Sequence, residues 1–227
     1  MHKVGRVICM AAAMACATAT GCSPKDGTEG SGGSDALASA DTPARLSSSD
    51  WSRTIDASML YSAKDQGVTI ATFIDMESAA SADFHRTLVA LDSARSGEVS
   101  IRLIHYPEPG HALAIPAANA AECAFASGKF ASFVDVVFEN QQTLAATKWS
   151  ELAARAGISN DQVARAIEMC AESGDVGLSV QSGMDLGNEL SVRSVPTVIV
   201  AGQRWAGVPS LAQLIAAVDS INGGPEK

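Results

Sequence analysis

The chain has 227 residues, of which 47% are hydrophobic, and this supports one ordinary domain with a buried core and shorter flanking segments. The formal net charge of −9 at pH 7 excludes the basic surface that nucleic-acid binding requires, so we expect no nucleic-acid partner.

Residues 1–21 have the pattern of a signal peptide. Basic residues occur among the first positions, and the apolar run 7–19 is too short for a membrane-spanning helix. Small residues then lie directly before Cys22, as in a bacterial lipoprotein signal. We therefore expect cleavage before Cys22 and diacylglycerol on its thiol, with acyl chains anchoring the protein to the extracytoplasmic face of the cell membrane. Secretion with an incidental cysteine is the alternative.

Residues 22–50 are rich in Gly, Ser, Ala and Asp and contain almost no large apolar residue. Burial cannot offset the entropy of ordering such a stretch, so we expect a flexible tether. The tether would hold the folded domain, predicted to span residues 51–227, away from the membrane.

Only two of the five cysteines are expected to remain as thiols or a disulfide in the folded domain. Cys9 and Cys16 lie in the predicted leader, and Cys22 would be acylated. Cys123 and Cys170 remain, so the folded domain has an even number of cysteines in an oxidising compartment.

The folded domain begins with alternating strand and helix patterns. Residues 68–74 are β-branched and apolar, as in a buried central strand. Apolar residues between positions 84 and 91 follow at helical spacing, and Gly97 is placed to end that helix. Apolar and polar residues then alternate over 99–105, which predicts a second strand. A strand, a helix and a strand of these lengths form a βαβ unit with parallel strands.

The middle of the chain is predicted to be helical, and the end returns to strands. Helices are expected over 117–126, 130–138 and 149–156. A capping box at 159–162 opens another helix, which carries residues 163–170, and a further helix runs to about residue 190. A turn at Val195-Pro196 leads into a strand, Gly202 marks a hairpin, and residues 211–221 form a final helix. The predicted order is βαβ, a helical insertion at about 111–190, then ββα.

Several short segments, in this order, resemble one known family. The run 73–85 (FIDMESAASADFH) resembles the DsbA-like active-site segment, in which an acidic pair precedes Cys-x-x-Cys at the start of a helix. Similar later segments are 105–107 with His111, 120–124 with 128–130, and 194–197 with Gly202 and 207–209. From about Gly67 to Ile221 the chain therefore resembles the DsbA-like thiol–disulfide oxidoreductases. The resemblance implies an α/β, thioredoxin-like fold with a helical insertion.

The chain departs from this family at the two motif cysteines, where it has Ser78 and Ser81. Thiol–disulfide exchange needs a thiolate that attacks a disulfide and a second thiol that resolves the mixed disulfide. A serine hydroxyl is hardly ionised and forms no S–S bond, so exchange at these positions is excluded. Ser78 fits the N-cap of the helix instead. A hydrolytic site of Ser78, His85 and Asp75 is an alternative, although no nucleophile elbow surrounds the serine.

The resemblance also implies roles for two other pairs of residues. Some members of the family form a second disulfide at the positions of Cys123 and Cys170, and as a structural bridge it would contribute on the order of 4 kcal/mol. The alternative is that this pair is itself redox-active. In the family, the residue before a cis-proline, here Val195 before Pro196, offers backbone hydrogen bonds to an extended peptide.

Together these features predict a membrane-tethered, redox-inactive module that binds extended or unfolded segments of exported proteins. No catalytic residue and no cofactor is expected. No metal is expected either, because a soft-metal site at His105 and Met76 would lack thiolate ligands. One alternative is a thiol–disulfide oxidoreductase that works through Cys123 and Cys170 or with a thiol-bearing partner. Another is a structural subunit of an envelope complex.

Overall fold

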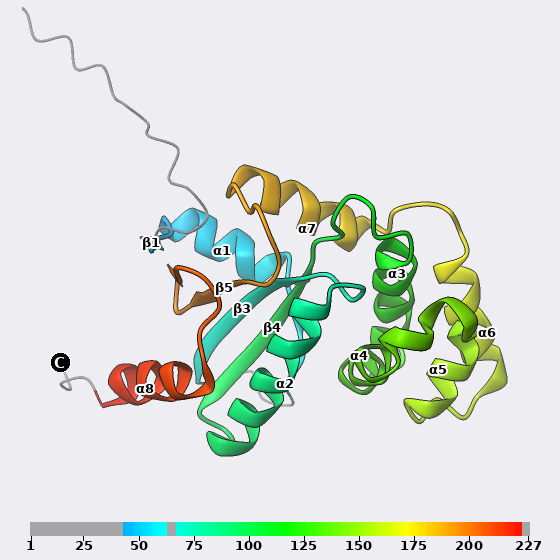
Figure 1. The fold of residues 1–227 in the computed structure, drawn as a ribbon, viewed down its shortest axis with the longest axis horizontal. Helices are drawn as coiled ribbons and strands as arrows, with labels where there is room; N and C mark the ends of the chain where they lie inside the picture. The colour runs from blue at the N-terminus through cyan, green and yellow to red at the C-terminus, as the bar shows by residue number, and fades with distance from the viewer. Residues whose placement is uncertain (1–42, 63–66, 224–227) are drawn as a thin grey trace, which may run out of the picture. The chain divides into compact units, whose positions relative to one another are not determined.

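The computed structural model describes residues 43–62 and 67–223, and a six-stranded sheet forms the centre of this region (Figure 1). Its strands are β1 (Ala44–Arg45), β2 (Met59–Leu60), β3 (Val68–Ile74), β4 (Val99–His105), β5 (Thr197–Val200) and β6 (Gln203–Arg204). They lie in the order β1-β6-β5-β3-β4-β2. β3 and β4 are parallel over their whole lengths, and every other neighbouring pair is antiparallel. The predicted βαβ unit is therefore confirmed.

Helices cover both faces of this sheet. They are α1 (Ser48–Asp56), α2 (Ala79–Ala94), α3 (Ala114–Phe125), α4 (Phe130–Glu139), the 3-10 helix η1 (Gln141–Ala146), α5 (Trp149–Arg155), α6 (Asp161–Ala171), α7 (Leu178–Glu189) and α8 (Leu211–Asn222). Successive side chains of a strand point to opposite faces of the sheet. On one face, Ile70 and Ile101 belong to the larger core, with residues of α2, α8 and the helical insertion. On the other face, Phe73 and Ile104 pack with residues of α7 and α1.

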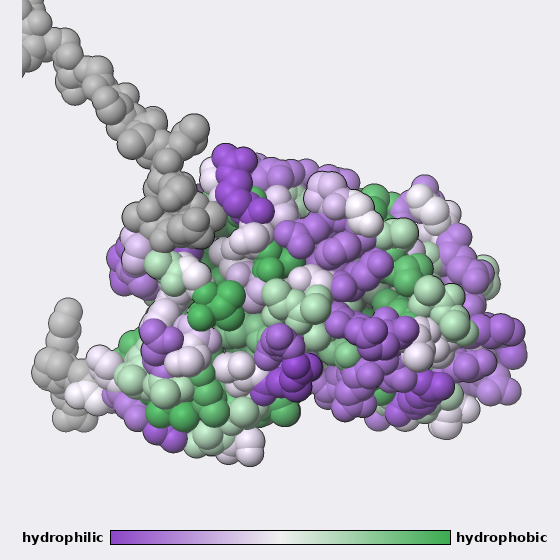
Figure 2. All heavy atoms as spheres, viewed as in Figure 1, coloured by the Kyte–Doolittle hydropathy of each residue, from purple (hydrophilic) through white to green (hydrophobic). Residues whose placement is uncertain are grey.

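The helical insertion has its own packed interior, in which α3 contacts α4 and α6, and α5 contacts α4 and α6. In α4 the buried residues Phe130, Phe133, Val134, Val137 and Phe138 form the stripe that helical spacing predicts. In the view of Figure 2, hydrophilic residues predominate over α4 and α5, whereas hydrophobic residues are more frequent over α8.

The order of elements matches the sequence prediction, and three local differences have physical reasons. The folded region begins before residue 51, so the predicted tether 22–50 is too long: β1 pairs with β6, and Ser47 caps α1 by accepting from the Asp50 N–H at 3.1 Å. The N-cap of α6 is Asn160 rather than Ser159, because the Asn160 side chain accepts from the N–H groups of Gln162 and Val163. β2 has two residues, too few for any periodicity.

Within the described region, none of the helices has the length and apolar character needed to cross a membrane. The predicted signal peptide, Cys22 and most of the predicted tether lie outside the described residues.

Candidate functional site

The two serines of the motif lie where β3 ends and α2 begins. Ser78 is the N-cap of α2, and its Oγ accepts a hydrogen bond from the Ser81 N–H at 3.4 Å. The Ser81 Oγ accepts in turn from the Asp75 N–H at 3.2 Å. Both residues are buried, with exposed fractions of 7% for Ser78 and 0% for Ser81. Both hydroxyls therefore stabilise the start of the helix, and the predicted N-cap role of Ser78 is confirmed.

Asp75 and Glu77 join this helix start to the loop between β4 and α3. The buried Asp75 carboxylate accepts from the N–H groups of Glu77 at 2.7 Å and Glu108 at 2.8 Å. It also lies 2.7 Å from Nδ1 of His111, and this hydrogen bond raises the pKa of the imidazole. Glu77 Oε2 accepts from the Leu113 N–H at 2.7 Å. The acidic pair thus holds residues 108–113 against the serine motif, a role that the sequence did not reveal.

One side of the serine motif is covered by η1 of the helical insertion. The Gln141 side-chain amide donates to the carbonyl of Met76 at 2.8 Å and to that of Ser78 at 3.1 Å. Carbonyl groups that precede or begin the first turn of α2 are therefore already engaged within the protein.

The loop before β5 contains a cis peptide bond between Val195 and Pro196. Phe73 near the end of β3 pairs with Thr197 at the start of β5, so the serine motif and the cis-proline loop leave the sheet at the same end. Val195 is 7% exposed, and it packs in the smaller core. Within the described part of the chain, no hydrogen bond reaches the backbone N–H or C=O of Val195.

The histidines near the motif are engaged away from Ser78. His85 Nε2 lies 2.8 Å from Asp135 Oδ1, and His111 Nδ1 contacts Asp75. Among the described residues, no histidine is hydrogen-bonded to the Ser78 hydroxyl. The triad of Ser78, His85 and Asp75, considered as an alternative from the sequence, is therefore not formed.

Asp75, Glu108 and His111 each offer a possible metal-ligand atom, and these atoms lie within 4.8 Å of one another. The Asp75 carboxylate already accepts three hydrogen bonds, which a cation would have to displace. His105 is buried, burial lowers its pKa to about 4, and Met76 is 1% exposed. The donors around Asp75 therefore fit the attachment of the 108–113 loop better than the ligation of a metal.

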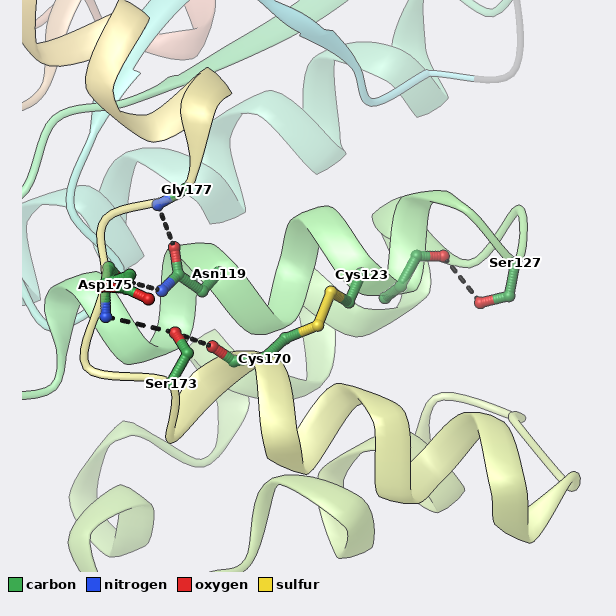
Figure 3. The surroundings of a disulfide bond; sticks show 8 residues. Asn119, Cys123, Ser127, Cys170, Ser173, Asp175 and Gly177 are labelled. Atoms are coloured by element: carbon green, nitrogen blue, oxygen red, sulfur yellow. Dashed lines mark hydrogen bonds between the residues drawn. A yellow bond between two sulfur atoms is a disulfide. The ribbon is translucent and has the colours of Figure 1, made fainter.

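Cys123 of α3 and Cys170 of α6 form a disulfide (Figure 3), with Cα atoms 6.6 Å apart and a separation of 47 positions in the sequence. In Figure 3, Asn119 of α3 lies beside the connection from α6 to α7. Its side chain donates to the Asp175 carbonyl at 2.8 Å and accepts from the Gly177 N–H at 3.0 Å. The bridge and Asn119 therefore fasten the end of α6 and the connection after it to α3.

A second polar cluster lies beside α2, and sequence reasoning missed it. The Tyr61 hydroxyl donates to Asp135 Oδ1 at 2.5 Å, and the same oxygen contacts His85. Tyr61 and Asp135 are 74 positions apart, and neither belongs to a recognisable motif, so only His85 gave a signal in the sequence.

Comparison with known proteins gives one family. The family model described as Thioredoxin matches residues 54–220. A thioredoxin-like oxidoreductase from Silicibacter pomeroyi DSS-3 is 20% identical, with a TM-score of 0.59, and the match covers 74% of this chain and 94% of that one. BdbD from Bacillus subtilis is 15% identical, with a TM-score of 0.65 and coverage of 81% and 99%. The thiol-disulfide exchange protein alpha-DsbA2 from Wolbachia pipientis is 15% identical, with a TM-score of 0.61 and coverage of 76% and 94%.

Among curated proteins, the comparison found no match. The family model nevertheless extends from α1 to α8, and the similar solved structures share the sheet-and-insertion architecture at low identity. The chain therefore belongs to the thioredoxin family, and its fold is that of the DsbA-like thiol–disulfide oxidoreductases.

Proposed function

We propose that this chain binds extended segments of exported proteins at the Val195-Pro196 loop, without thiol–disulfide exchange at Ser78 and Ser81. The observation that carries the proposal is the loop before β5, in which the Val195 backbone N–H and C=O are unpaired among the described residues. An extended peptide pairs with such groups as a strand adds to the edge of a sheet. The neighbouring motif contains no sulfur, so the bound segment would be held and released without a covalent step.

The surroundings of the loop favour a preformed binding edge. Val195 packs in the smaller core with Phe73 and Ile199, and the Thr197 hydroxyl donates to the Ser194 carbonyl at 2.8 Å. A backbone held in place before binding loses less conformational entropy when a peptide pairs with it. This arrangement supports a binding role that survives the loss of the motif cysteines.

The test measures binding of a reduced, carboxymethylated secreted protein to the full-length chain by fluorescence anisotropy. Pro196→Ala should weaken binding at least fivefold, because alanine lifts the restriction that the proline ring places on φ of residue 196, so the loop is less preorganised for binding. Pro43→Ala, at an exposed proline near β1, is the control and should bind as the parent chain does. Equally poor binding by the parent chain and Pro196→Ala would refute the proposal.

A second candidate function is thiol–disulfide exchange through Cys123 and Cys170. The observation that favours it is a hollow of about 400 Å³ beside the partly exposed Cys123, with Val163 and Ile167 among its lining residues. A partner thiolate would attack one sulfur, form a mixed disulfide and release the other sulfur as a thiolate. A second partner thiol would then displace the bound cysteine, leaving two reduced cysteines and an oxidised partner dithiol.

The reduction potential of this pair separates the two functions. A dithiothreitol titration read by mass spectrometry gives a value below roughly −300 mV for a structural bridge and above roughly −220 mV for a labile one. Loss of thiol–disulfide exchange in Cys123→Ala would support the second candidate. A reduction potential below roughly −300 mV would reject it.

We also propose that the protein acts at the extracytoplasmic face of the membrane, attached through Cys22. A disulfide between Cys123 and Cys170 fits an oxidising compartment. Metabolic labelling with radioactive palmitate should mark the full-length chain and leave Cys22→Ser unlabelled. Label in Cys22→Ser would contradict the assignment.

A further inference from the structure

A groove lies between α2 and α4 and continues along η1, on helices that the Val195-Pro196 loop does not use. It consists of two adjoining hollows of about 290 Å³ and 310 Å³. The two hollows share Ala82, Arg86, Phe138 and Glu139. We call their union the α2–α4 groove. It begins at Ala79, directly after the helix cap, and extends to Val89.

Part of the groove is apolar. Ala82 and Phe138 contribute buried surface, and Val89 is a large hydrophobic residue with 44% of its surface exposed. The His85 ring stacks on Phe138 with ring centroids 4.6 Å apart. An aliphatic chain that lies against this apolar wall removes apolar surface from water.

One carboxylate in the groove, that of Asp135, is held by the described residues through one of its two oxygens. Asp135 Oδ1 accepts from the Tyr61 hydroxyl at 2.5 Å and contacts His85 Nε2 at 2.8 Å. Burial and the hydrogen bond to Asp135 raise the pKa of Tyr61, so the phenol keeps the proton that it donates. Asp135 Oδ2 has no hydrogen-bond partner among the described residues, and 40% of the Asp135 side chain is exposed. The carboxylate is thus fixed on one side and available on the other.

The charges along the groove are unbalanced. Arg86 is the cation that lines it, and its guanidinium is paired with Asp83. Glu139 is exposed, and its carboxylate forms no ion pair or hydrogen bond with another described residue. Asp135 and Glu139 therefore present negative charge beside the apolar wall, while Arg86, the cation on the facing helix α2, is already paired with Asp83.

We propose that the α2–α4 groove binds a lysine or arginine side chain of a basic polypeptide segment. The aliphatic stem of that side chain lies along Val89 and Phe138, and its charged end meets Asp135 Oδ2 and Glu139. Long cationic side chains bury their stems while the charge stays solvated, and hydrogen bonds from a cation to a carboxylate are the stronger kind. The net charge of −9 steers a basic segment towards the chain. This site goes beyond the proposed function, because it uses neither Val195 nor Pro196.

The test uses the full-length chain and two synthetic peptides in isothermal titration calorimetry at 150 mM salt. One peptide alternates arginine with leucine, and the other has citrulline, a neutral isostere, in place of each arginine. The arginine peptide should bind at least tenfold more tightly than the citrulline peptide. Asp135→Asn and Glu139→Gln should each weaken binding of the arginine peptide about tenfold, which corresponds to one hydrogen bond to a charged group.

A matched control separates the site from general attraction to an acidic protein. Glu172→Gln removes the same charge at the end of α6, a helix that packs on α3 and α5. It should leave the affinity of the arginine peptide unchanged. Glu139→Gln alters an exposed side chain and keeps the test valid if Asp135→Asn does not fold. Equal binding of both peptides, or equal weakening by Glu172→Gln and Glu139→Gln, would overturn the proposal.

Discussion

His111 Nδ1 lies 2.7 Å from the buried carboxylate of Asp75, so a loop residue near the start of α3 is tied to the end of β3. This hydrogen bond raises the pKa of His111 above its ordinary value of 6.5. A group whose pKa is higher in the folded state stabilises the protein fully below its unfolded pKa. That contribution to stability is lost as the pH rises through the pKa of the group in the folded state.

His111→Ala should therefore destabilise the protein at pH 6 and have little effect at pH 9. The expected loss at pH 6 is about 0.5–1 kcal/mol, because partial exposure of the imidazole weakens the pair. Urea unfolding at the two pH values measures the difference. An equal loss at both would show that protonation of His111 contributes nothing to the contact.

The scaffold around the serine motif should still support redox chemistry if sulfur is restored. Replacing both serines, Ser78→Cys with Ser81→Cys, should give a chain that catalyses reduction of insulin by dithiothreitol. Position 78 is the N-cap of α2, where the helix dipole stabilises a thiolate. The single variant Ser78→Cys is the control and should remain inactive, since no second thiol resolves the mixed disulfide. An inactive double variant would show that more than the sulfur atoms has changed at this site.

Removing the bridge between α3 and α6 should cost stability. The double variant Cys123→Ala with Cys170→Ala should lower the free energy of unfolding by about 2–5 kcal/mol, because the unfolded chain gains conformational freedom. Guanidinium unfolding without reductant gives the value, and the parent chain in dithiothreitol should approach it. A loss below about 1 kcal/mol would exclude a structural role for the bridge.

Gly183 in α7 should tolerate no side chain. A Cβ placed there would lie 2.5 Å from the backbone carbonyl oxygen of His105 in β4, and neither atom belongs to a flexible side chain. Gly183→Ala should destabilise by about 1–3 kcal/mol through overpacking, although glycine to alanine favours an isolated helix by about 1 kcal/mol. Ser182→Ala, on the exposed side of the same helix, is the control and should change stability by less than about 0.5 kcal/mol. A stabilising effect of Gly183→Ala would mean that α7 sits farther from β4.

The sequence predicts the fold well because the hydrophobic periodicity of its helices and strands is strong and turn residues separate them. The buried stripe of α4, the apolar β3 and the turn residue Gly202, with φ of 80°, all lie where the patterns place them. Short elements such as β2 and β1 escape prediction, because a two-residue strand is defined by its partner and has no pattern of its own.

The candidate site was predictable only in part. Ser78 at a helix start follows from local capping preferences, and the pair Val195-Pro196 follows from a resemblance in sequence. The attachment of the 108–113 loop by Asp75 and the contact of Asp135 with Tyr61 depend on residues that are far apart in the chain. No local pattern encodes such contacts, and they become visible only when the sheet and the insertion bring the elements together.

The two outermost strands of the sheet, β1 and β2, have two residues each, while β3 and β4 in the interior have seven. A long open edge exposes a row of unpaired backbone N–H and C=O groups, to which a strand of another molecule can add. Here each outermost strand has only two residues, and both pair with the neighbouring strand on the inner side. The sheet is thus poorly suited to recruit a second copy by strand addition, which protects a crowded population of this protein against aggregation.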